Sequence, residues 1–141
     1  MKRAAAFQPL SHDHYEGLRL AAALRKALRR GGDVSAWPEA VGAFWSEHLA
    51  EHFAEEETLV LPVLREGTPT LAERMEHEHD QIRRLAQAAE RGDPGALSAF
   101  AGALVAHIRF EEREAFPAAE RLLGIGPYAA ASSPDSDDAD G

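Results

Sequence analysis

The chain has 141 residues, of which 24 are Asp or Glu and 15 are Lys or Arg, so its formal net charge at pH 7 is −9. A chain of this length fits one domain with a substantial hydrophobic core. The lack of cysteine excludes disulfides, cysteine zinc sites and iron–sulfur clusters. The acidic balance argues against a nucleic-acid partner, because phosphates require a basic surface.

No stretch of the sequence approaches the ~18 consecutive apolar residues of a membrane span. The basic residues at the N-terminus are not followed by a sustained apolar segment of the kind found in signal peptides. We therefore expect a cytoplasmic protein that has no membrane partner.

Glycine and proline residues divide the chain into four long segments. The breaks fall at 31–32, 67–69 and 92–94, where these residues cluster. Within each segment, apolar residues recur at the three- and four-residue spacing of a helix. We predict helices over approximately 11–30, 35–66, 70–91 and 94–123, with Ser11, Ser35, Thr70 and Asp93 as N-caps.

The connections between these helices are short, so consecutive helices are expected to be antiparallel neighbours. The predicted fold is all-α, an up-down-up-down antiparallel four-helix bundle over residues 1–126. Residues 127–141 are rich in aspartate and have no large apolar side chain after Tyr128. We expect them to form a disordered acidic tail.

Histidines and glutamates continue the apolar stripes of all four predicted helices. Because residues four apart stack on one helix face, each helix is expected to direct at least one histidine into the core. Two of the helices add a glutamate four residues after a histidine. The expected inward residues are His14 beside Leu18, His48, His52 and Glu56 between Trp45 and Leu59, His79 between Met75 and Ile82, and His107 and Glu111 after Leu104.

The two halves of the chain repeat this pattern. Residues 52–56 and 107–111 share the spacing H-x-x-x-E, and an acid–histidine pair stands at both 13–14 and 78–79. This repeat predicts a pseudo-twofold site for two metal ions. Imidazole and carboxylate without thiolate suit iron, manganese or zinc. Fewer than six protein ligands per ion would leave room for a small ligand.

The order of a lone histidine, H-x-x-x-E, a second lone histidine and H-x-x-x-E resembles the hemerythrin-like (HHE cation-binding) family over about 12–117. The segments 13–15, 52–56 and 107–112 carry the resemblance. It implies two iron ions with an oxo or hydroxo bridge, with manganese and zinc as alternatives, and an open position for O₂, peroxide or NO. The ligands that it implies are His14, His52, Glu56, His79, His107 and Glu111.

The chain departs from the oxygen-carrying hemerythrins on the third helix. Those proteins have H-x-x-x-H there, whereas the residue four before His79 is Met75. The missing imidazole makes the site resemble regulatory or stress-related members. Several assignments stay open at this point: His77 instead of His79, Glu112 instead of Glu111, and further roles for His48 and Glu76.

Three functions are compatible with such a site. The leading hypothesis is a di-iron protein that binds or senses O₂, peroxide or NO. One alternative is a di-iron enzyme that decomposes peroxide at the same centre. The other is an iron-responsive interaction module with an unknown protein partner, for which the acidic tail is the only hint in the sequence.

Overall fold

The computed structural model describes residues 2–129, which are almost entirely helical and contain no strand. The prediction of an all-α fold is therefore confirmed for these residues. The α-helices are α1 (Gln8–Arg30), α2 (Trp37–Phe44), α3 (Ala50–Leu59), α4 (Leu61–Gly67), α5 (Pro69–Glu90), α6 (Ala96–Phe110) and α7 (Phe116–Leu123). Two π-helical turns, η2 (Trp45–Leu49) and η3 (Glu111–Ala115), and two 3₁₀ turns, η1 (Ala5–Phe7) and η4 (Gly126–Tyr128), complete the order.

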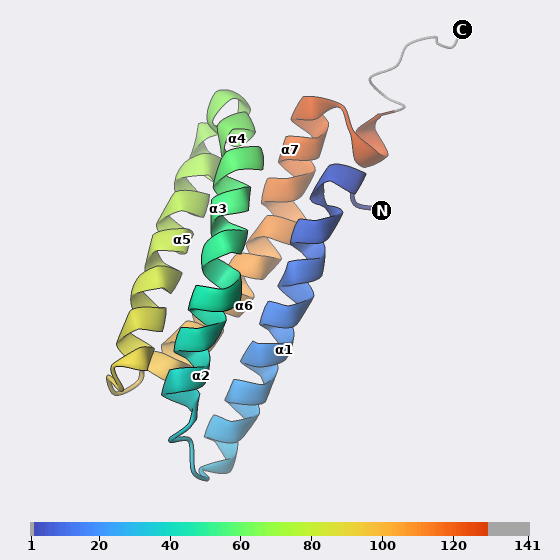
Figure 1. The fold of residues 1–141 in the computed structure, drawn as a ribbon. Helices are drawn as coiled ribbons and strands as arrows, with labels where there is room; N and C mark the ends of the chain where they lie inside the picture. The colour runs from blue at the N-terminus through green and yellow to red at the C-terminus, as the bar shows by residue number, and fades with distance from the viewer. Residues whose placement is uncertain (1, 130–141) are drawn as a thin grey trace, which may run out of the picture.

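Several of these elements follow one another in long helical runs that lie side by side (Figure 1). Helices α2, η2, α3 and α4 form one run with only Val60 between α3 and α4, and α6, η3 and α7 form another. The chain reverses direction between α1 and α2, between α4 and α5, and between α5 and α6 (Figure 1). Helix α6 packs against both α1 and α5, and α5 also packs against α2 and α4.

Prolines occupy the first turns of α1, α2, α4, α5 and α7, where a residue without a free N–H is tolerated. Helix α1 begins at Gln8 with Pro9 in its first turn, so the predicted N-cap at Ser11 is wrong. Helix α5 begins at Pro69 and α6 begins after Gly95, which has a φ of +77°. The predicted caps Ser35, Thr70 and Asp93 are likewise wrong, and none of these four helix starts has a side-chain cap hydrogen bond.

Two clusters of buried apolar side chains fill the interior. The first includes Phe53, Ile82 and Phe100, and the second includes Met75 and Phe116. Met75 is fully buried, as expected for a core residue.

The predicted phase of two helix faces is wrong by one residue. Leu18 and Leu59 were expected in the core, but they are 37% and 49% exposed. On α1 the inward position next to His14 belongs to Gly17, where an added Cβ would lie 3.1 Å from the Ile108 side chain. After α3 the inward position belongs to Val60, which is fully buried. In both places the exposed leucine stands directly beside the residue that takes the core position.

The predicted domain boundary at 126 falls at the start of η4. Residues 127 and 128, which were assigned to the tail, therefore belong to a 3₁₀ turn. The rest of the predicted tail, 130–141, lies outside the described residues. Among the residues that the structure describes, no helix is both long and apolar enough to cross a membrane.

Candidate metal centre

Six polar side chains from four helical runs meet in the interior of the protein. All six are at most 4% exposed. They are the same residues that the family resemblance implies as ligands. The structure places His14 on α1, His52 and Glu56 on α3, His79 on α5, His107 on α6 and Glu111 at the start of η3.

The six residues form two groups that share their carboxylates. One group contains His14 and His52, the other contains His79 and His107, and both include Glu56 and Glu111. Within each group the possible ligand atoms lie within 4.8 Å of one another. Each group could hold a metal ion, and both carboxylates are common to the two groups.

The contacts of the two glutamates show this sharing. Glu56 reaches His14 Nε2 with one oxygen, at 3.2 Å, and His79 Nε2 with the other, at 2.9 Å. Glu111 contacts the same two nitrogens at 2.8 and 3.2 Å. Each carboxylate therefore spans both groups.

A further carboxylate holds the outer ring nitrogen of each histidine. A carboxylate only accepts hydrogen bonds, so Nδ1 donates, and a histidine that loses its second proton to a metal would direct the lone pair of Nε2 toward the centre. Such outer partners orient metal-binding histidines and fix their tautomer. The Nδ1–carboxylate distances are 2.7 Å for His14–Glu112, 3.1 Å for His52–Asp13, 2.9 Å for His79–Glu57 and 2.7 Å for His107–Glu78.

Sequence reasoning did not find these orienting carboxylates. Asp13 and Glu78 each precede a centre histidine in the repeated acid–histidine pairs, but each orients a histidine on another helix. Glu57 directly follows Glu56 in a run of three glutamates, of which only Glu56 was expected to face inward. Glu112 had been considered only as an alternative ligand. The paired acids at 56–57 and 111–112 were the available signal in the sequence.

Two of the buried ring nitrogens have no hydrogen bond. The Nε2 atoms of His52 and His107 each lie 2.9 Å from the glutamate four residues later in the chain. These distances are within the range of an ion pair, but the direction of approach does not suit a hydrogen bond, so both nitrogens lack one. An unsatisfied buried polar atom costs about 1–3 kcal/mol. A metal ion would use these lone pairs, so the donor set fits a metal.

The surrounding carboxylates also favour positive charge within the centre. Burial by itself would lower the pKa of His14, but its hydrogen bonds to three surrounding glutamates raise that pKa to about 11. Burial likewise lowers the pKa of His79, and the contacts with Glu111 and Glu56 outweigh it, so that the pKa is about 10. In the metal-free protein, protons supply the charge that a divalent cation would provide.

Aromatic rings cover two of these histidines. Phe53 stacks on His79 with a ring-centroid distance of 3.9 Å and an interplanar angle of 4°. Phe116 stacks on His14 at 5.3 Å and 8°. These apolar faces exclude water from the imidazoles and restrict their rotation.

Two alternative assignments are distinguished by the position of the side chain. His77 is exposed on α5, whereas His79 is 1% exposed and lies in the centre. Glu112 is 31% exposed at its side chain and contacts the outer edge of His14, whereas Glu111 lies inside. Glu76 is exposed and pairs with Arg65, so the structure keeps it apart from the centre.

The expectation that His48 faces inward is wrong, because the residue is exposed. It lies in the π-helical turn η2, and a π turn contains an extra residue that shifts the helical phase. Leu49 takes the buried position instead. His12 is also exposed.

Comparison with known proteins agrees with this site. The family model for the hemerythrin HHE cation-binding domain matches residues 5–119, a range that includes all six centre residues. No curated protein and no solved structure matches the chain significantly. The match covers most of the chain, and the buried histidine–glutamate centre is suited to a cation. The chain belongs to the hemerythrin HHE cation-binding family.

Proposed function

We propose that this protein is a hemerythrin-like four-helix bundle that holds two iron ions and binds or senses O₂ or a related small ligand, such as peroxide or NO. The observation that carries this proposal is the pair of buried groups that share Glu56 and Glu111. Two ions held by these common carboxylates would lie close enough to act on one small ligand.

The donor set supports iron and an open coordination position. Imidazole and carboxylate ligands suit iron, with manganese and zinc as the competing metals. Each group offers two histidines and two shared glutamates, which is fewer ligands than octahedral coordination requires. Bound iron would supply the redox-active binding of the small ligand. The residues of the chain hold the ions, orient the imidazoles through their Nδ1 atoms and exclude bulk water.

Metal content and spectroscopy test this function. Protein purified anaerobically from iron-supplemented cells should contain close to two irons per chain. Its electronic spectrum should change on exposure to O₂ and then to peroxide. His79→Ala should lower the iron content, whereas the matched control His77→Ala, which changes an exposed histidine on the same helix, should not. A folded protein that remains metal-free would overturn the proposal.

A second candidate function is the decomposition of peroxide. It is favoured by Met75, which occupies the position of the third-helix imidazole of oxygen carriers and is buried among apolar side chains. Fewer protein ligands leave more room for a reacting molecule. Added peroxide should then release O₂ catalytically, and His52→Ala should abolish the release. Turnover no faster than that of free iron would exclude this enzyme activity.

The third hypothesis, an iron-responsive interaction module, depends on the acidic tail. Residues 130–141 of that tail lie outside the described residues. Its test is whether the metal-free and metal-loaded proteins melt at different temperatures, because a module of this kind requires metal binding to be coupled to folding.

A further inference from the structure

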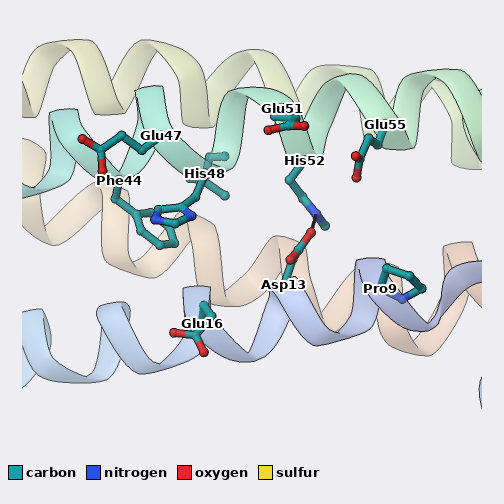
Figure 2. Close-up of a pocket in the computed structure, with 10 residues that line it drawn as sticks. Pro9, Asp13, Glu16, Phe44, Glu47, His48, Glu51, His52 and Glu55 are labelled. Atoms are coloured by element: carbon teal, nitrogen blue, oxygen red, sulfur yellow. Dashed lines mark hydrogen bonds and ion pairs between the residues drawn. The ribbon is translucent and has the colours of Figure 1, made fainter.

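A cavity of about 340 Å³ lies between α1 and the run from α2 to α3, immediately outside the metal centre (Figure 2). Asp13 of α1 and His52 of α3 point toward one another across it. His52 is only 4% exposed; its Nδ1 faces Asp13, and its Nε2, which has no hydrogen bond, lies 2.9 Å from Glu56 in the centre. The same side chain therefore lines the cavity and belongs to the centre.

The lining of this cavity is strongly acidic. It contains no lysine and no arginine. Glu47, Glu51 and Glu55 follow one another at a spacing of four. None of the three forms an ion pair with another described residue. Like charges at this spacing repel each other and destabilise a helix. The carboxylates that line the cavity are Asp13, Glu16, Glu47, Glu51 and Glu55.

The internal repeat shows that this acidity is confined to one side of the centre. The repeat that pairs His52 with His107 also pairs the positions five residues before, one residue before and three residues after each histidine. The counterparts of Glu47, Glu51 and Glu55 in the second half are Gly102, Ala106 and Phe110. The second side therefore has small and apolar residues where the first has three carboxylates.

A basic residue also covers the second side of the centre, the side of His79 and His107. Phe110 is 2% exposed, and the guanidinium of Arg74 lies over its ring at 4.1 Å from the centroid. The same arginine donates a hydrogen bond of 2.8 Å to Glu78, the counterpart of Asp13. Asp13 is 48% exposed at its side chain, and among residues 2–129 it pairs with His52 alone. The two sides of a nearly symmetric centre therefore differ in charge and in access.

We propose that the acidic cavity is the uptake route of the metal centre, a transient site where a divalent cation collects before it passes Asp13 and reaches His52. This inference rests on the proposed function, because it requires a centre that binds metal. A cleft lined by one sign of charge concentrates ions of the opposite sign and raises association rates by about 10–1,000-fold. The same charge repels anions from this face.

The rate of metal uptake tests the route separately from the affinity of the centre. Metal-free protein is mixed with Co²⁺ in a stopped-flow instrument, and the cobalt absorption is followed. The variant Glu47→Gln/Glu51→Gln/Glu55→Gln should load about tenfold more slowly at low ionic strength. It should reach the same final stoichiometry, because all six centre residues are retained. The difference should shrink at high salt, since the Debye length falls from about 30 Å at 0.01 M to about 3 Å at 1 M.

A matched control removes the same number of charges elsewhere. Glu39, Glu66 and Glu73 are exposed and do not line the cavity, so replacing these three with glutamine should leave the loading rate within about twofold of the wild type. Replacing Glu47, Glu51 and Glu55 with aspartate retains the charge and should preserve fast loading. Circular dichroism verifies that each variant is folded.

The possible outcomes separate the two proposals. Equal loading rates for the cavity variant and the control, with normal stoichiometry, would overturn the route alone. A wild-type protein that binds no cobalt at equilibrium would overturn the metal centre and the route with it. Slow, salt-dependent loading that is specific to the cavity variant supports the route.

Discussion

Glu112 accepts a hydrogen bond of 2.7 Å from Nδ1 of His14, while the preceding residue, Glu111, lies 2.8 Å from Nε2 of the same ring. Two consecutive carboxylates thus contact opposite edges of one imidazole. Glu56 and Glu57 do the same to His79, with both distances at 2.9 Å. In each pair one glutamate lies in the centre and the next one orients the histidine from outside.

Removal of an orienting carboxylate should weaken metal binding without removing a ligand. Glu112→Ala leaves Nδ1 of His14 without its acceptor, and we expect metal affinity to fall by about 10–100-fold. Competition with a chelator measures the change. Glu114→Ala is the control, because Glu114 is 51% exposed at its side chain and pairs with Arg74, at 3.5 Å, rather than with a histidine of the centre. Equal chelator midpoints for the two variants would contradict an orienting role.

The shared glutamates should control both ions, and each histidine only one. Glu56→Ala removes a carboxylate from both groups, so the metal content should fall well below one ion per chain. His107→Ala affects one group and should leave about one ion. Elemental analysis after gel filtration gives the stoichiometry, and circular dichroism verifies the fold. If the two variants retained equal amounts of metal, Glu56 would not be a shared ligand.

The stabilisation by metal should increase with pH. A histidine with a raised folded-state pKa stabilises the metal-free fold fully below its unfolded value of 6.5, and this stabilisation disappears as the pH rises through the folded-state pKa, about 10 for His79 and about 11 for His14. Metal ions bind the neutral ring, so they gain affinity as protons leave.

The measurement is the rise in melting temperature when metal is added. This rise should grow steadily between about pH 6 and about pH 9, because protons compete with the metal less at each step. The circular dichroism of metal-free and metal-loaded protein at matched ionic strength gives the value. A rise that is independent of pH would show that no proton is displaced from the centre.

The N-terminal segment should contribute strongly to stability. Arg3 donates hydrogen bonds to Glu120 at 2.8 Å and to Glu112 at 3.0 Å, and the N–H of Ala4 donates to Glu120 at 2.6 Å. The side chain of Glu120 is only 1% exposed. Arg3→Ala leaves this buried carboxylate without its cation, and we expect a loss of about 3 kcal/mol in the free energy of unfolding.

Urea unfolding of the metal-free protein measures this loss. Lys2→Ala is the neighbouring control, because Lys2 is exposed. Its replacement should change the free energy of unfolding by less than about 0.5 kcal/mol. A similarly small change for Arg3→Ala would show that Glu120 is not stabilised by the ion pair.

Helical spacing explains why the centre residues could be identified before the structure. His52 and Glu56 stand four residues apart, as do His107 and Glu111, and both pairs are in phase with buried apolar residues. Both residues of each pair therefore lie on the helix face that points into the core. The same argument failed at His48, because the π turn η2 shifts the phase between it and His52. A regular period also misplaced Leu18 by one residue, since glycine took the inward position.

The sequence by itself determined the helical character of the chain and indicated that histidines and glutamates lie on the inward helix faces, because helix propensity and the period of 3.6 residues are local properties. The structure distinguished His79 from His77 and Glu111 from Glu112. Tertiary packing alone decided that Glu56 and Glu111 are common to both groups and that Asp13 orients His52 rather than its neighbour His14. The acidic cavity beside His52 likewise arises where α1 meets another helical run. Contacts between helices depend on their relative rotation and separation, and local spacing contains no information about either.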